Sequence, residues 1–386
     1  MRFVLVLLVA ASLAAESVTE NYPDGSKSLT VTVDKEGRRN GALTAWWPGG
    51  KIVKEKSKWD DGVRHGLTQT FDEKGKLLVE ETWIKGRLIY PRAQVQIVEA
   101  FARIERETQA YVAALPKPVN PGSAPPADQA QALARLRQYR NLCGLDHDVL
   151  LDPTYTDEAQ EGAEILAAIG KLDHHPSKPT GWSDADYAKA KNACGHGNLA
   201  MGAGSLIRAV DMWMDDSDAS NIGALGHRRW MLNPVMQSCG FGISGKFQVI
   251  WAHDDKRSKP VRQQWQAFPP PGFVPASHFG DRHAWHISLN PADYSVDLKT
   301  MTFQIFPLDQ RLVRSGAAYV LDHDGSEGSG YGCYKNARIV RPAQDKQPKG
   351  QPPYVVGKNR SYEAVVGGLS PKGDAPKELT WVVSFY

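Results

Sequence analysis

The chain has 386 residues, of which 41% are hydrophobic and 23% charged, as in ordinary globular proteins of two or three domains. Its formal net charge is +3, from 46 basic and 43 acidic residues, and this balance excludes the strongly basic surface that nucleic-acid binding needs. The 35 glycines and 25 prolines indicate many turns, so we expect much β and loop structure.

The N-terminus has the pattern of a secretory signal peptide. Arg2 supplies a positive charge, residues 3–11 form an apolar run, and Ala14 and Ala15 are small enough for a cleavage site. The run is too short to cross a bilayer, and no later stretch is a better candidate. We therefore predict a signal peptide at residues 1–15, a secreted or periplasmic mature protein and no transmembrane segment. A short buried N-terminal strand or helix is the alternative.

An internal repeat occupies residues 21–87. Gly25, Gly50 and Gly75 are spaced by 25 residues, and apolar residues alternate with polar ones between them. This pattern predicts antiparallel strands joined by tight turns, in which neighbouring hairpins bury each other's faces. The segments Tyr22–Gly25, Trp47–Gly50 and Phe71–Gly75 resemble MORN-type repeats, which we place at residues 20–90. Such repeats would serve either as a contact surface for a protein or lipid partner or as a structural stack.

A helical spacer and a linker follow the repeats. Ile97, Phe101 and Ile104 recur at helical spacing, so we predict a spacer helix within residues 91–115 and a proline-rich linker at 116–126. Three further helices are expected at about 127–142, 157–169 and 205–214, followed by a β-hairpin over 241–251. Beyond residue 265, alternation near 301–305, 362–366 and 379–385 predicts a β-sandwich-like domain over 265–386, in which 308–360 would be a long loop.

Four motifs occur in order in the middle of the chain. They read LDHHP (172–176), GHGNLAMG (195–202), AVDMWMDD (209–216) and SNIGALGHRRWMLNP (220–234). Together they resemble the CAP superfamily, the SCP-like group, in its bacterial secreted form. The resemblance implies an α-β-α sandwich, which we place at residues 127–258. The predicted fold class is therefore α+β, with a CAP domain flanked by an N-terminal antiparallel β repeat region and a C-terminal β-sandwich-like domain.

The resemblance also implies a cleft that holds two histidines and two carboxylates. The first histidine falls on His174, with His175 as the alternative, the second histidine falls on His227, and one carboxylate falls on Asp216. The other carboxylate position is Gly197, which has no side chain, although His196 is adjacent. Imidazoles are good ligands for zinc or another divalent cation, so His174 and His227 are the candidate metal ligands, with His175, His196 and Asp216 as alternatives. A purely structural hydrogen-bonded cluster is the competing interpretation.

In an oxidising compartment, the four cysteines permit two disulfides. Our preferred pairing joins Cys143 to Cys194, which end elements that flank the candidate site, and Cys239 to Cys333 then remains. Buried free thiols are the alternative. For the arginines that follow His227, we expect pairing with nearby aspartates and exposure of one of the two. We expect Trp230, Met231 and Leu232 to pack inward.

Three function classes are compatible with these motifs. The first, which we prefer, is a non-enzymatic extracellular binding protein whose cleft or repeats engage a lipid-like ligand or a cell-envelope component. The second is a metal-dependent hydrolase that uses His174, His227 and Asp216 as catalytic candidates. The third is a structural or adhesive envelope module that works through protein partners of the repeats. Fold similarity does not choose among them, because it does not transmit function.

Overall fold

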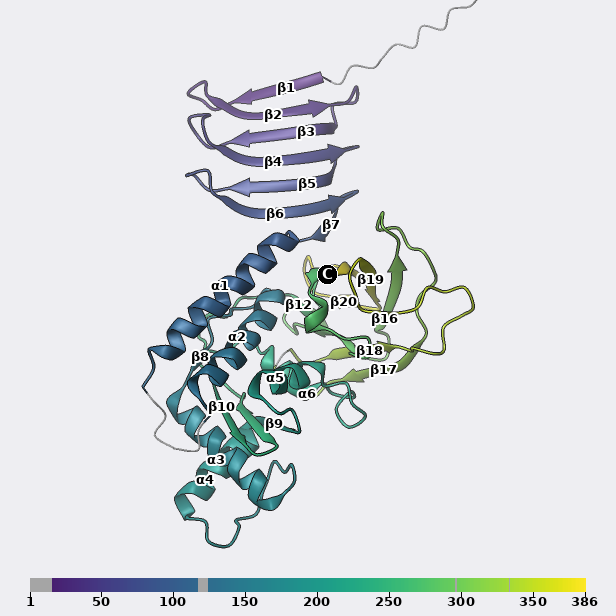
Figure 1. The fold of residues 1–386 in the computed structure, drawn as a ribbon. Coiled ribbons are helices and arrows are strands. Elements are labelled where there is room, and N and C mark those ends of the chain that lie inside the picture. The colour runs from purple at the N-terminus through teal and green to yellow at the C-terminus, as the bar shows by residue number, and fades with distance from the viewer. Residues whose placement is uncertain (1–15, 117–123, 296, 333) are drawn as a thin grey trace, which may run out of the picture. The chain divides into compact units, whose positions relative to one another are not determined.

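A computed structural model describes residues 16–116, 124–295, 297–332 and 334–386 (Figure 1). The predicted signal peptide, most of the predicted linker and Cys333 lie outside these residues. The chain divides into two compact units, one up to Gln94 and the other from Val95 to Tyr386. Within the described ranges, none of the helices is both long and apolar enough to span a membrane.

The first unit is a single seven-stranded sheet whose strands follow one another in chain order (Figure 1). Every neighbouring pair is antiparallel, as the alternating pattern predicts. Along the middle of one face, the paired residues Val31, Leu43, Ser57 and Thr68 form a buried row. The strands are β1 (Glu16–Asn21), β2 (Lys27–Val33), β3 (Arg39–Trp46), β4 (Val53–Asp60), β5 (Val63–Phe71), β6 (Leu77–Ile84) and β7 (Arg87–Tyr90).

Each repeat of the first unit is a hairpin, which explains its glycines. Gly25 and Gly75 occupy turns with φ of 82° and 80°, a left-handed conformation in which a side chain would be strained. The predicted antiparallel strands are therefore confirmed, while the assignment to MORN-type repeats stays a prediction.

All but the first residue of helix α1 (Gln94–Ala113) belongs to the second unit, and the helix lies within the range 91–115. Next come five helices around a four-stranded sheet of order β8-β10-β11-β9. The helices are α2 (Pro126–Leu142), α3 (Pro153–Ile169), α4 (Asp184–His196), α5 (Leu206–Asp215) and α6 (Gly226–Met231). The strands are β8 (Leu150–Leu151), β9 (Gly197–Met201), β10 (Ser238–Ser244) and β11 (Phe247–Trp251).

Alternating side chains of this sheet enter two separate cores. On β11, Val249 and Trp251 pack with α3 and α4, whereas Ile250 between them joins a second cluster with α2 and α5. On β9, Leu199 and Ala200 divide between the same two clusters. A period of two in side-chain direction is what a β-strand imposes. Helices therefore cover both faces of the sheet, giving three layers, as the resemblance implies.

Helix α3 lies directly on the backbone of β10, and two glycines make this approach possible. A Cβ atom on Gly242 would lie 2.1 Å from the carbonyl oxygen of Ala159, and one on Gly240 would lie 2.2 Å from the amide nitrogen of Thr156. The helix itself starts at its Asp152 N-cap, whose carboxylate accepts hydrogen bonds from the amides of Thr154 and Tyr155. It therefore begins four residues earlier than the predicted start at 157.

The C-terminal part of the second unit consists mainly of two four-stranded sheets. One has the order β12-β14-β18-β17 and the other β13-β21-β19-β16. Side chains of the two sheets meet: the rings of Trp285 and Tyr362 are 6.4 Å apart, and those of Trp265 and Trp381 are 5.2 Å apart. The first sheet contains β12 (Trp265–Phe268), β14 (Trp285–Leu289), β18 (Ala337–Pro342) and β17 (Leu321–Glu327). The second contains β13 (Gly272–Val274), β21 (Leu379–Phe385), β19 (Arg360–Gly367) and β16 (Thr302–Leu308); β15 (Tyr294–Ser295) and β20 (Ser370–Pro371) pair separately.

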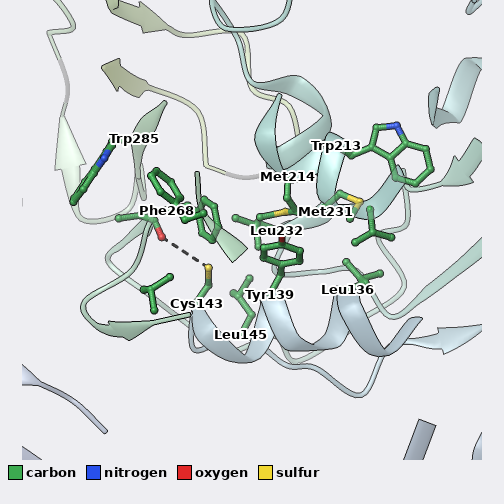
Figure 2. Packing of buried hydrophobic residues seen from close by; sticks show 14 of the residues in the cluster. Leu136, Tyr139, Cys143, Leu145, Trp213, Met214, Met231, Leu232, Phe268 and Trp285 are labelled. Atoms are coloured by element: carbon green, nitrogen blue, oxygen red, sulfur yellow. Dashed lines mark hydrogen bonds between the residues drawn. The ribbon is translucent and has the colours of Figure 1, made fainter. Parts of the chain in front are cut away.

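The hydrophobic cluster that contains α2 and α5 also extends into the C-terminal sheets. Tyr139 of α2 contacts Phe268 of β12, with ring centroids 5.8 Å apart, and Trp213 and Trp285 belong to the same cluster (Figure 2). The boundary that we predict between residues 258 and 265 stays a prediction, and the core is continuous across it.

Several sequence-based expectations differ from the structure. The segment 308–360 is not a single long loop, because it contains β17 and β18. The predicted disulfide between Cys143 and Cys194 is wrong, because the two thiols lie in different hydrophobic clusters, on opposite faces of the sheet. Cys239 is a buried free thiol, and burial raises its pKa to about 12, which suppresses the reactive thiolate.

His278 joins α1, α2 and the C-terminal part of this unit. Its ring lies 5.0 Å from that of Phe101 and 4.8 Å from that of Tyr139, while an Arg135 nitrogen is 2.9 Å from its Nε2. Burial, and then the charge of Arg135, lower the pKa of His278 to about 2, so the imidazole is neutral in the folded protein.

We predict that Gly242→Ala destabilises the second unit by about 3 kcal/mol, because the new methyl group would force α3 off the sheet. Urea unfolding should measure this loss as a lower midpoint at unchanged slope. Gly223→Ala is the matched control, since nothing lies within 4 Å of that position and its φ is ordinary. Equal stability of the two variants would contradict the close approach.

We also predict an acid-linked loss of stability at His278. The unfolded imidazole binds a proton below about pH 6.5 whereas the folded one does not, so stability is greatest above pH 6.5 and falls toward lower pH. Between pH 6.5 and 4, His278→Gln should reduce the slope of unfolding free energy against pH by about 1.4 kcal/mol per pH unit. Urea titrations across that range measure the slope, and an unchanged slope would show that folded His278 is protonated.

Candidate functional site

A cavity of about 650 Å³ brings the predicted site residues together. His174 lies in the loop between α3 and α4, Asp216 ends α5, and His227 is in α6. All three line this cavity, and His175 does so as well. Residues more than fifty positions apart in the sequence therefore meet at one site.

Asp216 is the buried anchor of the site. It ends α5 in the left-handed conformation, with φ of 48°, and its side chain is only 1% exposed. Its carboxylate accepts hydrogen bonds from the Nδ1 of His227 at 2.7 Å and from the amides of His227 and Arg228 at 2.9 and 3.3 Å. The carboxylate thus fixes both the start of α6 and the orientation of the His227 ring.

The hydrogen bonds of the two imidazoles define their tautomers. Nδ1 of His174 lies 2.7 Å from the carbonyl oxygen of Cys194, and Nδ1 of His227 lies 2.7 Å from the Asp216 carboxylate. Both partners are acceptors only, so each Nδ1 must carry the hydrogen. In the neutral ring, Nε2 then holds the lone pair and is the atom left for a ligand.

The position of the absent carboxylate is closed by packing. Gly197 begins β9 directly after α4, and a Cβ atom there would lie 2.5 Å from the carbonyl oxygen of Ala193 and 2.8 Å from that of Ile250. This backbone has no room for a glutamate side chain. The neighbouring His196 is exposed, donates a hydrogen bond from Nδ1 to the backbone carbonyl of Asn192 at 3.0 Å and stacks on Trp251. It does not line this cavity.

His253 is a further site residue that sequence reasoning missed. It lines an adjoining cavity of about 380 Å³ together with His174 and His227, and its ring stacks on Trp230 at 3.7 Å. Burial, followed by the nearby imidazoles His196, His174 and His227, lowers the pKa of His253 to about 4. No motif includes His253, so only its position two residues after the buried strand β11 could have suggested it.

Both arginines after His227 are fully buried, which corrects the expectation that one of them is exposed. Arg228 donates to the carbonyls of Met214 and Ala284 at 2.6 Å and to that of Asp215 at 2.5 Å. Arg229 donates to the Glu327 carboxylate and, at 3.1 Å, to the carbonyl of Tyr334. Burial lowers the pKa of Arg228 to about 10, so it remains charged at neutral pH. Met231 and Leu232 are buried, and Trp230 is partly buried against the same core, as predicted.

As a metal centre, the site offers two suitable imidazole nitrogens. Among the described residues, no group of three or more His, Cys, Asp or Glu side chains is arranged to hold a metal ion. His174 and His227 could therefore supply two ligands to a divalent cation, and the remaining positions would fall to water or a bound molecule.

The comparisons with known proteins identify the region that contains this site. Residues 133–249 match the family model of CAP, the cysteine-rich secretory protein family, so the chain contains a CAP domain. The matched residues include His174, Asp216 and His227 but not His253. No curated protein and no solved structure matches the chain.

We predict that Asp216→Asn destabilises the protein by about 2 kcal/mol. The substitution weakens the charge-assisted hydrogen bond to the His227 ring and disturbs the hydrogen bonds from the backbone amides of His227 and Arg228. Asparagine accepts the left-handed backbone, so the substitution tests the charge and not the conformation. Asp255→Asn is the control, since that side chain is exposed and should change stability by less than about 0.5 kcal/mol. Urea unfolding compares the two, and equal losses would mean that Asp216 is no anchor.

Proposed function

We propose that the CAP domain binds a small ligand with an apolar part, and that the protein acts as a binding protein without chemistry of its own. The observation that carries this proposal is the lining of the larger cavity. Leu172, Met201 and Met212 line it and are 42%, 44% and 45% exposed. Large apolar side chains that gather in a concave site beside a few polar groups are typical of ligand pockets.

The chemistry of the lining defines the ligand class. Methionine side chains are flexible and polarisable, so Met201 and Met212 would adapt to an alkyl chain of no fixed shape. His174 and His227 would meet a hydroxyl or other hydrogen-bonding head group at their Nε2 atoms. A lipid-like molecule with a polar head satisfies both requirements.

This proposal predicts that octan-1-ol, as a probe, binds the native protein and that Met201→Gln and Met212→Gln each weaken binding about tenfold. Burial of about 55 Å² of apolar surface at ~25 cal/mol per Å² corresponds to that factor. Isothermal titration calorimetry measures the affinity. Val261→Gln is the matched control, because Val261 is 39% exposed and lines neither cavity. Absence of octan-1-ol binding would overturn the proposal.

A second candidate function is a divalent-cation site on His174 and His227, as a metal-dependent hydrolase would need. The two fixed tautomers favour it, since both rings keep Nε2 for a ligand. Zinc, when bound there, would act as a Lewis acid. Asp216 would hold the His227 ring through Nδ1, and catalysis by these residues would need an open coordination position.

For this second candidate, we predict that native mass spectrometry with added zinc detects one bound ion, which is lost in both His227→Ala and His174→Ala. A chelator should restore the mass of the bare polypeptide. Zinc that survives both substitutions would place the ion elsewhere, and failure to bind zinc would remove the hydrolase from consideration.

Export and a role for the repeats belong to the same proposal. The pattern of residues 1–15 and the secretory family of the CAP match support a secreted or periplasmic protein. The seven-stranded sheet presents apolar side chains such as Leu67 and Leu78, 43% and 56% exposed, which supports contact with an envelope component or protein partner.

A further inference from the structure

A second cavity adjoins the first at the imidazole pair. Its volume is about 380 Å³, and it shares His174, His175, Ser220, Asn221 and His227 with the larger cavity. A single molecule that extends past the two imidazoles could therefore occupy both cavities.

The two cavities differ in charge. Asp173, Asp216 and Asp218 line the larger one, whereas none of the residues that line the smaller one is Asp, Glu, Lys or Arg. A phosphate, carboxylate or ammonium group would lose its hydration there without an opposite charge to replace it. The smaller cavity therefore fits a neutral group.

Ring faces and polar groups are combined in the smaller cavity. Trp230, His253 and Tyr331 line it, and so do the amide side chains of Asn198 and Asn221. The rings of Trp230 and His253 are stacked with an interplanar angle of 23°, while Tyr331 is 37% exposed. A sugar ring has an apolar C–H face for such rings and hydroxyls for amides, imidazoles and Ser220.

Tyr331 comes from the C-terminal part of the chain, between β17 and β18, and is held against the CAP domain. The buried Arg229 lies 5.6 Å from the centre of the Tyr331 ring and donates to Glu327 and to the Tyr334 carbonyl. A Cβ atom on Gly226 would lie 3.1 Å from that ring, and one on Gly332 would lie 2.5 Å from Trp230. The loop thus fits closely over α6 and forms one wall of the cavity.

We propose that this smaller cavity is a subsite for a neutral sugar, so that the ligand is a glycolipid-like molecule. The sugar stacks against Tyr331, whose side chain is partly exposed, with Trp230 alongside, and the alkyl chain lies on Met201 and Met212. This inference rests on the proposed function for the alkyl part only; the sugar subsite is an additional claim, and Tyr331 is its specificity-determining residue.

The test compares octyl β-glucoside, octyl β-galactoside and octyl β-N-acetylglucosaminide with octan-1-ol, all below their critical micelle concentrations, by isothermal titration calorimetry on the full mature chain. At least one glycoside should bind about tenfold more tightly than octan-1-ol. Tyr331→Ala should remove this gain and leave octan-1-ol affinity unchanged, while Tyr331→Phe, which keeps the ring, should retain most of it. Met212→Gln should weaken the alcohol and the glycosides alike.

Other outcomes separate the two claims. If octan-1-ol binds but no glycoside binds more tightly, or if Tyr331→Ala leaves the gain intact, the sugar subsite is overturned and the apolar site stands. If a glycoside binds, Tyr331→Ala abolishes that binding and octan-1-ol does not bind, the sugar subsite stands and the apolar site fails. If no probe binds, both proposals fail. Circular dichroism of Tyr331→Ala and Tyr331→Phe verifies that each variant folds as the native chain does.

Discussion

The buried side chain of Arg228 connects the parts of the molecule that form the candidate site. A guanidinium without contact with water needs an acceptor for each of its five N–H groups. Here the carbonyls of Met214, Asp215 and Ala284 provide three. His286 Nδ1 and Ser217 Oγ, both at 3.4 Å, provide the other two. Met214 and Asp215 end α5, and Ala284 belongs to the C-terminal part. Because unsatisfied buried donors are costly, this set of contacts fixes the end of α5, the start of α6 and the approach to β14 together.

The site geometry follows from that constraint. Asp216 directly follows the carbonyls that Arg228 binds, and its carboxylate accepts the amide of Arg228 as well as Nδ1 of His227. Arg229 extends the same junction to Glu327 and Tyr334 on either side of Tyr331. Of residues 227–229, His227 thus belongs to the site, and Arg228 and Arg229 belong to the junction with the C-terminal sheets. The CAP domain and the C-terminal sheets therefore share both a core and a cavity.

The sequence was sufficient for features that depend on local pattern or on the family motifs. Alternation predicted the N-terminal sheet and three of the strands of the C-terminal part, and His174, Asp216 and His227, which the motifs singled out, line one cavity. The sequence was insufficient where contacts between distant segments decide which side chains are buried. Buried arginines look exposed in a sequence because charge normally favours solvent, and the carbonyls that satisfy Arg228 leave no mark in it. Helix α4 escaped prediction because its alanine- and lysine-rich segment has no clear apolar face.

Contacts between distant segments also explain which features around the site could not be predicted. The sequence shows that Gly197 replaces the expected carboxylate. It does not show the reason, which is that the backbones of Ala193 and Ile250 leave no room for a side chain there. His253 and Tyr331 lie outside the motifs and reach the cavity only through strand pairing and the loop between β17 and β18. The disulfide pairing failed because Cys143 and Cys194, although both end elements that flank the site, lie on opposite faces of a sheet.

The central claim is that two imidazoles are held with Nε2 available to a ligand, and nitrogen-15 NMR of the histidine rings in the native protein tests it most directly. Long-range proton–nitrogen correlations at neutral pH, assigned with His174→Gln and His227→Gln, distinguish the two neutral tautomers. The account predicts a protonated Nδ1 and a lone pair on Nε2 in both rings. A hydrogen on Nε2 and a lone pair on Nδ1 in either ring would contradict the contact with Cys194 or Asp216 and, with it, this description of the site.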